Sequence, residues 1–245
     1  MNRKLMLGVA IGLIAAQLWA QDKAPKKIEL KTDADKANYA MGANAARGAR
    51  QQFEIQGIPF DPDLVLRGFR EGLGDGKLAL TDAEMTAAFQ ALLEDVAKRN
   101  AAEGDAFLAA NKKKKDVVTL PSGLQYKILK KGTGKSPTMR DVITVHYRGR
   151  LLNGREFDNT YLGKQPQAME LIKTIPGWQE ALPLMTVGSK WELYVPTDMA
   201  FGPQGNEVIP ANCTLVFEIE LLDINKPGTA GGPQRGKPPA AEEIK

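Results

Sequence analysis

The chain has 245 residues, of which 43% are hydrophobic and 25% charged, which suits one or two ordinary globular domains. Its formal net charge of +4 is small and dispersed, which argues against a nucleic-acid-binding surface. With one histidine and one cysteine, the sequence has no zinc-ligand spacing. Any Ser-His or Cys-His nucleophile pair would have to use His146. The cysteine, Cys213, precedes a strand-like run, so a buried small hydrophobe is favoured over a reactive thiol.

Residues 1–20 carry the features of a secretory signal peptide. Arg3 and Lys4 precede an apolar run that ends at Trp19, and the small residue Ala20 stands before a charged segment. The run is shorter than the ~20 residues that span a bilayer. The sequence therefore predicts export, and because Leu18 stands where a small residue is preferred, an uncleaved anchor remains the alternative.

Residues 32–115 show helical signals only. Helix starts are indicated at Thr32 with Asp35, at Asp61 before a proline, and at the capping box of Thr81 and Glu84. The first helix has a stripe of small residues, which allows close approach of another helix but buries little area by itself. So thin a core predicts a homodimer built from residues 32–96.

The third helix is expected to continue as a linker over residues 97–116. Its first half has apolar residues at core spacing, whereas its second half is mostly Ala, Asn, Glu and Lys. We expect a packed beginning followed by a solvated rod. The lysines at 112–115 are better explained as favourable charges at a helix C-terminus than as a nucleic-acid patch.

From Val117 the apolar period changes to two, which predicts β-strands. Apolar residues alternate around residues 124–128, 143–147, 191–195 and 215–221, and Asn153-Gly154 is a strong hairpin signal. A short helix is expected from Pro176. The fold class is therefore α+β: a helical domain, a long connecting helix, and an antiparallel sheet wrapped over a short helix at 117–225, with a disordered tail at 226–245.

Five segments of the sheet domain together resemble the FKBP-type peptidyl-prolyl isomerases. They are LPSGLQYKILKKGTG (120–134), VHYRGRLLNGREFDNT (145–160), IPGWQEALPLMTVGSKWELYVP (175–196), AFG (200–202) and TLVFEIELLDI (214–224). The blocks occur in the family's order, which makes the resemblance specific. The helical first half and the export signal are similar to the dimeric, periplasmic or surface members, including the macrophage infectivity potentiator type.

This resemblance implies an apolar slot for proline. Trp178 would form its floor and Ile175 would supply a methyl surface and a backbone N–H. The other residues implied at the site are Tyr147, Phe157, Asp158, Phe201 and Phe217, with Val208 and Ile209 in the flap and Gln167 and Met169 at the wall. Asp158 would make a polar contact at the mouth, and His146 would point away because it alternates with Tyr147.

Several positions depart from the family pattern. Phe201 stands where tyrosine is typical, which removes a hydroxyl worth about 1 kcal/mol of ligand binding. Gln167 and Met169 replace larger apolar residues, and Gly163 stands where a basic residue often pairs with the aspartate. Lys164 is then the nearest possible partner of Asp158. We expect a slow but active isomerase that binds the family's macrolide inhibitors weakly.

The expected activity is cis-trans isomerisation of X-Pro bonds in unfolded or partly folded exported proteins, without metal or cofactor. The expected location is the periplasm or outer surface of a Gram-negative bacterium. The alternative is a non-catalytic holdase whose degraded pocket only docks unfolded chains. Membrane or nucleic-acid binding by the tail or the lysine cluster is a third, weaker interpretation, given the low charge.

Overall fold

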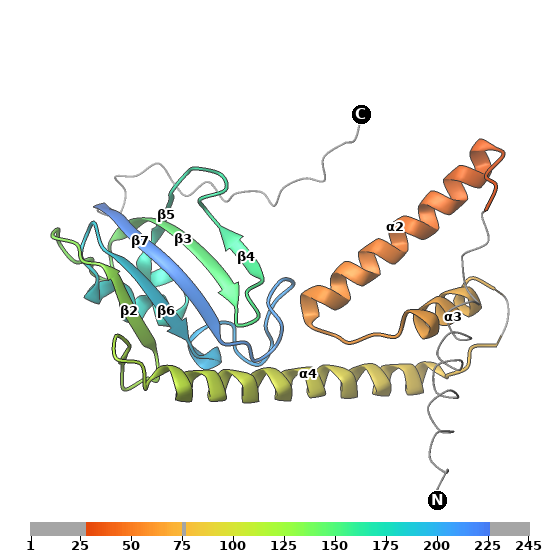
Figure 1. The fold of residues 1–245 in the computed structure, drawn as a ribbon, viewed down its shortest axis with the longest axis horizontal. Helices are drawn as coiled ribbons and strands as arrows, with labels where there is room; N and C mark the ends of the chain where they lie inside the picture. Colours follow the sequence, from red (N-terminus) through yellow and green to blue (C-terminus); the bar gives the residue numbers. More distant parts are fainter. Residues whose placement is uncertain (1–27, 75–76, 226–245) are drawn as a thin grey trace, which may run out of the picture. The chain divides into compact units, whose positions relative to one another are not determined.

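The computed structural model describes residues 28–74 and 77–225 (Figure 1). The chain divides into two compact units, residues 1–50 and 51–245, so the boundary lies inside helix α2. The expected signal peptide and tail lie outside the described residues. Within the described ranges, no helix is both long and apolar enough to cross a membrane.

The described helices before the sheet are α2 (Asp33–Gln56), α3 (Pro62–Gly72) and α4 (Asp82–Asn111). The helix starts agree with the sequence signals. The side chain of Asp61 accepts from the first N–H groups of α3, and Thr81 forms a reciprocal capping box with Glu84 at α4. The N–H groups that a helix start leaves unpaired are satisfied locally, which is why these starts are readable from sequence.

The strands form one antiparallel sheet in the order β1-β2-β6-β7-β3-β4, and β5 also pairs with β3. Their bounds are β1 (Val118–Thr119), β2 (Gln125–Lys130), β3 (Val142–Leu151), β4 (Glu156–Asn159), β5 (Gln167–Glu170), β6 (Lys190–Val195) and β7 (Leu215–Asn225). The long strands β3 and β7 pair along their whole length at the centre. Together with the helices before it, this sheet confirms the predicted α+β fold class.

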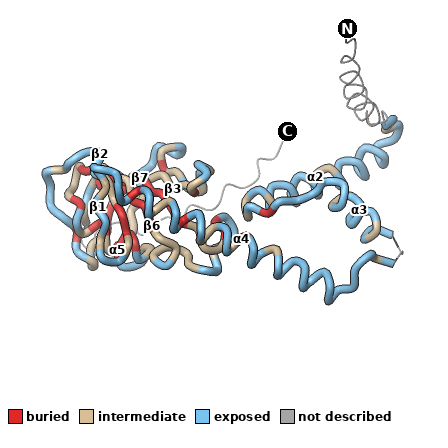
Figure 2. Tube along the Cα trace, turned by 60° about the horizontal axis from the view of Figure 1, so that its bottom comes forward, coloured by how far each residue is buried: buried red, intermediate tan, exposed pale blue. Residues whose placement is uncertain are grey.

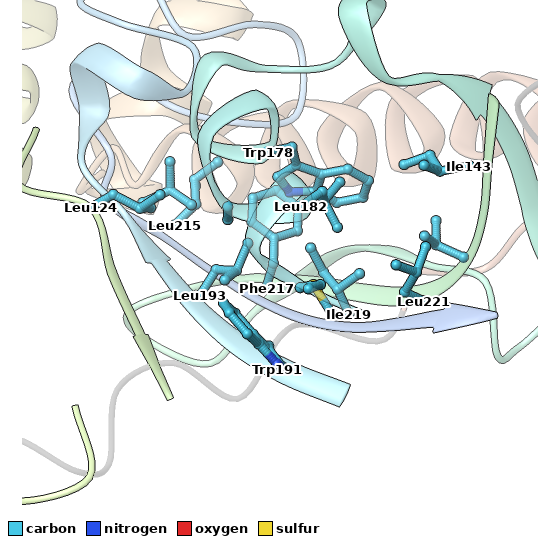
Figure 3. Close-up of a cluster of buried hydrophobic side chains, with 14 of the residues drawn as sticks. Leu124, Ile143, Trp178, Leu182, Trp191, Leu193, Leu215, Phe217, Ile219 and Leu221 are labelled. Atoms are coloured by element: carbon cyan, nitrogen blue, oxygen red, sulfur yellow. The ribbon is translucent and has the colours of Figure 1, made fainter. Parts of the chain in front are cut away.

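Short helices cover the inner face of the sheet. They are η1 (Leu171–Lys173), α5 (Pro176–Ala181), η2 (Leu182–Leu184) and η3 (Thr197–Met199). Trp178 and Leu182 project from α5 and η2 toward Phe217 and Ile219 of β7 (Figure 3). The alternating apolar residues of β3, β6 and β7 meet these helices in one core, as the period of two predicts.

The second half of α4 packs against the sheet domain, so the expectation of a solvated rod is wrong. Gly104 and Asn111 are buried, and a Cβ at Gly104 would lie 2.4 Å from the Thr214 hydroxyl oxygen. The rings of Phe107 and Tyr194 lie 5.7 Å apart. Small and polar residues were read as solvent-facing, but here the absence of a side chain at Gly104 permits the close approach.

The first half of α4 is only partly packed in the single chain, although the sequence predicted a packed beginning. Val96 is 3% exposed, as that prediction requires. Met85, Phe89 and Leu93 all have large exposed fractions. Buried positions gather between the strands and α5, whereas α2 and α3 are largely exposed (Figure 2). Most apolar residues of α3 and of the beginning of α4 are therefore exposed in the single chain, whereas Phe53 at the end of α2 contacts Phe60 with ring centroids 5.1 Å apart.

Charged residues form a connected set on the outer face of the sheet. Arg148 of β3 and Lys190 of β6 both bind Glu218 of β7, with nitrogen-to-oxygen distances of 3.1 and 2.8 Å. Arg150 binds Glu192 at 2.7 Å. Because side chains alternate along a strand, this ionic face and the apolar core belong to the same strands.

Candidate active site

Trp178 is positioned by the start of α5. Pro176 occupies the first turn of this helix, where its missing N–H carries no cost. Gly177 allows the helix to approach β6, because a Cβ there would lie 2.5 Å from Cγ1 of Val195. The Trp178 side chain is consequently held within the core with 4% of its surface exposed.

Four aromatic side chains form a continuous set of edge-to-face contacts around Trp178. Its ring centroid lies 5.0 Å from that of Tyr147 and 5.3 Å from that of Phe217, at interplanar angles of 83° and 82°. Phe157 contacts Phe217 at 5.6 Å and 85°. These separations lie in the preferred range for aromatic pairs. The side chains come from β3, β4, α5 and β7, so the fold brings together the slot residues that the resemblance implied.

Gly149 makes room for this cluster, and the sequence analysis did not identify it. It lies on β3 opposite Phe217 of β7 and Asp158 of β4. A Cβ built at Gly149 would lie 2.6 Å from two carbons of the Phe157 ring and 2.9 Å from the Phe217 ring. A glycine inside a strand often marks such a close approach, and this signal was present in the sequence.

Asp158 is held by Tyr147. The Tyr147 hydroxyl donates a 2.5 Å hydrogen bond to Oδ2 of Asp158. Burial, together with this hydrogen bond and the negative charge of Asp158, raises the pKa of Tyr147 well above its usual range. The phenol therefore remains a hydrogen-bond donor at physiological pH, and the carboxylate is oriented at the exposed edge of the aromatic cluster.

The expectation that Lys164 is the partner of Asp158 is not met. Among the described residues, Asp158 forms no ion pair, and its hydrogen-bond partner is Tyr147. Lys164 lies in the loop after β4 with a φ of 53°. Lys164 is near Asp158 along the chain, whereas the partner that Asp158 binds comes from the adjacent strand β3.

Strand β5 carries Gln167 and Met169, the two residues expected at the wall. Met169 lies opposite Ile143 and packs against the core, and Gln167 lies opposite Val145 on the same face of the strand. Ile175 immediately precedes α5, where its carbonyl accepts from the N–H of Trp178 at 2.9 Å. The Ile175 side chain also packs against the core.

The expected flap residues differ in their exposure. Ile209 is 2% exposed and belongs to the core cluster, whereas Val208 is 42% exposed and lies outside it. Phe201 packs against the core without a polar group to offer a ligand. Ile209 therefore belongs to the core that also contains Trp178, Phe201 packs against that core, and the Val208 side chain faces solvent.

His146 lies on the opposite face of β3 from Tyr147. Its Nδ1 is 3.0 Å from the Thr160 hydroxyl, and its ring stacks on Tyr161 with centroids 4.7 Å apart. The alternation of side chains along β3 predicted this orientation. The histidine is part of the outer face of the sheet, away from the aromatic cluster.

Comparison with known families gives two matches that cover most of the chain. Residues 133–222 match the family described as FKBP-type peptidyl-prolyl cis-trans isomerase. Residues 34–128 match the family described as the domain amino terminal to FKBP-type peptidyl-prolyl isomerase. The helical half and the sheet half thus match families that accompany one another.

Individual relatives match over nearly their whole length. The outer membrane protein MIP of Legionella longbeachae is 39% identical, over 92% of this chain and 99% of that protein. The FKBP-type peptidyl-prolyl cis-trans isomerase FkpA of Escherichia coli K12 is 34% identical, over 91% and 87%. The crystal structure of FkpA from Escherichia coli matches with a TM-score of 0.54 over 81% of this chain and 99% of that chain.

Proposed function

Because this chain belongs to the FKBP-type peptidyl-prolyl cis-trans isomerases, we propose that its four clustered aromatic residues form the slot in which X-Pro bonds rotate. The residues are Tyr147, Phe157, Trp178 and Phe217. The continuous edge-to-face contact among them is the observation that carries the proposal. The comparisons support isomerase activity in protein folding and do not favour the holdase alternative.

The chemistry of rotation suits such a slot. An amide is planar because of resonance, and rotating it meets a barrier of about 20 kcal/mol. At the twisted transition state the resonance is lost and the carbonyl is less polar, so an apolar, water-poor environment favours the transition state over the planar ground state. No bond is made and no proton has to move, so Asp158 acts by orientation and charge.

Backbone and polar groups at the edge of the slot orient the substrate. The N–H of Ile175 forms no hydrogen bond with any described residue, so it can donate to a substrate carbonyl. The Tyr147 hydroxyl and the Asp158 carboxylate supply a second, fixed polar pair. Phe201 cannot add a hydroxyl, and by the usual worth of one hydrogen bond the loss is about 1 kcal/mol.

The direct test is the exchange rate between cis and trans X-Pro in a short peptide, measured by NMR with and without the full chain. Acceleration at micromolar protein is expected, and no acceleration would refute the enzymatic function. Phe157→Ala should lower kcat/KM, and it removes a half-buried ring. Trp178→Ala should lower turnover further, but loss of a buried Trp costs about 3–5 kcal/mol of stability, so its thermal midpoint must be measured too.

Macrolide binding tests the missing hydroxyl at Phe201. Wild type is expected to bind a macrolide inhibitor of the family weakly. Phe201→Tyr should lower the dissociation constant several-fold, since one hydrogen bond worth about 1 kcal/mol corresponds to roughly a fivefold change. An unchanged dissociation constant would show that the hydroxyl does not reach the ligand.

We also propose that the protein is a homodimer through residues 32–96. Neither α2 nor α3 has a buried residue, although α3 carries a strong apolar face. Leu66 and Phe69 of α3 are 57% and 45% exposed. A helix gains most of its stability from packing such a face, and a second copy of the chain supplies the matching one.

Light scattering coupled to size exclusion, on the chain from Gln21, measures the mass in solution. A dimer mass is expected, and Phe69→Glu should shift it toward the monomer because a charge would enter the apolar interface. Arg70→Glu, which changes the charge at the neighbouring position of the same helix, is the matched control. A monomeric mass for the wild type would contradict the dimer.

The proposal also includes the location: the protein is exported to the periplasm or outer surface and acts there on proline-containing unfolded proteins. The signal-like residues 1–20 and the similarity to the outer membrane protein MIP of Legionella longbeachae support it. Fractionation of a Gram-negative host expressing the full chain tests the location. Recovery of the protein in the cytoplasm alone would contradict export.

A further inference from the structure

The loop of residues 206–209, called the flap loop below, is closed by its own asparagine. Oδ1 of Asn206 accepts from the N–H groups of Val208 and Ile209 at 2.9 and 2.8 Å. The Asn206 N–H donates to the Ile209 carbonyl at 2.8 Å. The loop is thus a compact turn, and it places the Ile209 side chain in the core that contains Trp178.

Side chains outside the flap loop bind its successive carbonyls. Nε2 of Gln56 lies 3.4 Å from the Asn206 carbonyl oxygen and 3.3 Å from that of Glu207. Nη2 of Arg155 donates to the Val208 carbonyl at 2.8 Å. Gln56 ends helix α2, and Arg155 follows the β3–β4 turn, so the loop is held by segments distant in sequence.

Arg155 connects these segments directly. The same Nη2 atom that binds Val208 also donates to the Ile55 carbonyl at 2.9 Å, in the last turn of α2. Among the described residues Arg155 forms no salt bridge, so its charge faces carbonyl oxygens. The C-terminal end of a helix carries partial negative charge, which favours a cation at this place.

Helix α4 holds the chain just after the flap loop. Nδ2 of Asn100 donates to the Ala211 carbonyl at 2.9 Å, and Nδ2 of Asn212 lies 3.4 Å from the Ala97 carbonyl. The flap loop is therefore anchored at both of its ends and along its carbonyls. Of these anchors, Arg155 is the one that carries a charge and reaches two segments at once.

We propose that Arg155 is a positioning residue for the isomerase, which fixes the flap loop by bridging the Val208 carbonyl to the last turn of α2. The proposal rests on the proposed slot, because it acts through Ile209, which shares one hydrophobic core with Trp178 and Phe217. Without the bridge the loop would have to be ordered when substrate binds. Such a cost weakens the binding of ground state and transition state alike, which raises KM and leaves kcat nearly unchanged.

Cys213 offers a second readout of the same bridge. It is the single cysteine of the chain, it is half-buried, and it lines a cavity together with Ile55, Gly57, Asn100 and other residues of α4 and the hairpin. Burial raises the pKa of its thiol to about 11, although the nearby charge of Arg155 acts to lower it. Loosening the contact between the last turn of α2 and Arg155 would expose this cavity and speed reaction of the thiol.

The test compares Arg155→Gln with Arg140→Gln in the full chain. Arg140 is exposed in the turn before β3, so it is a matched loss of charge in the same domain. Peptide isomerisation gives KM and kcat, and thermal unfolding reports folding. A maleimide gives the rate at Cys213, divided by the thiolate fraction from thiolate absorbance so that loss of the nearby Arg155 charge does not enter. Loss of a charged hydrogen bond predicts about a tenfold rise in KM for Arg155→Gln and faster maleimide reaction, with neither in Arg140→Gln. Arg155→Lys should recover part of the KM, because an ammonium can still donate to both carbonyls.

Each result separates this proposal from the isomerase function itself. An inactive wild type would refute the proposed function. An active wild type with equal KM for Arg155→Gln and Arg140→Gln would overturn the role of Arg155, and a raised KM with unchanged Cys213 reactivity would overturn the link to α2. If Arg155→Gln does not fold, Gln56→Ala replaces it, because Gln56 holds the same loop from the end of α2. A rise in KM of less than tenfold for Gln56→Ala supports the proposal. A KM and a maleimide rate equal to those of the wild type overturn it.

Discussion

Replacing Gly149 by alanine perturbs the aromatic cluster at one known point. The new Cβ would lie 2.6 Å from Cε2 and Cζ of Phe157 and 2.9 Å from Cε1 of Phe217. Phe217 is buried, whereas Phe157 is half-buried on β4 and can swing outward. Restoring an ordinary carbon-carbon separation of about 3.5–4.0 Å moves the Phe157 ring by roughly 1 Å.

The magnitude follows from the contacts that are lost. The edge-to-face pair of Phe157 and Phe217 is worth about 0.5–1.5 kcal/mol, and overpacking a core costs about 1–3 kcal/mol. Alanine recovers about 0.5–1 kcal/mol because glycine is unfavourable within a strand. We therefore expect a net loss of about 1–2 kcal/mol of unfolding free energy, and a fall of about tenfold to a hundredfold in kcat/KM from the displaced wall.

The assay is NMR exchange of a cis-trans X-Pro peptide, with urea unfolding of each variant. Gly163→Ala is the matched control, because the nearest atom to its Cβ would be the Thr160 carbonyl oxygen at 4.0 Å. In a double-mutant cycle, Phe157→Ala should remove most of the stability cost of Gly149→Ala. Activity of Gly149→Ala within twofold of wild type, with unchanged stability, would refute the packing argument.

The remaining predictions concern polar contacts. Tyr147→Phe keeps the ring but loses the hydrogen bond to Asp158, so we expect a loss of about 1 kcal/mol in stability and several-fold in kcat/KM; wild-type activity would show that the bond orients nothing. The raised pKa of Tyr147 keeps its hydroxyl protonated, so kcat/KM of the wild type should not fall from loss of this proton between about pH 6 and 9. Glu218→Gln should lower the thermal midpoint of unfolding at neutral pH. Partial burial acts to raise the pKa of Glu218, but hydrogen bonds and charge interactions with Lys190 and Arg148 outweigh the burial, so the pKa is lowered. A carboxylate with a lowered pKa stabilises the fold above its unfolded-state pKa, and this stabilisation is lost as pH falls through the folded-state pKa. The difference in thermal midpoint between wild type and Glu218→Gln should therefore shrink between about pH 5 and pH 3, and a constant difference would contradict it.

Features that depend on a few neighbouring residues could be predicted from the amino-acid sequence. Asp61 and Thr81 cap their helices with their own side chains, and Asn153-Gly154 makes the turn between β3 and β4, with Gly154 at a φ of 87°. The period of two fixed which face of each long strand is apolar, and therefore that His146 points away from the cluster. These properties follow from local hydrogen bonding and side-chain direction, which need no distant partner.

Only the tertiary structure decided which residues meet. Gly104 packs on Thr214, and Asp158 is bonded to Tyr147 rather than to Lys164. Arg155 reaches a carbonyl that is separated from it by 100 residues. A sequence pattern carries no distance between segments so far apart, and small or polar residues look solvent-facing until another surface lies against them. The packing of the second half of α4 and the contacts of Arg155 depend on such distant segments. The aromatic residues of the proposed slot were predicted instead from the order of segments that the chain shares with the family.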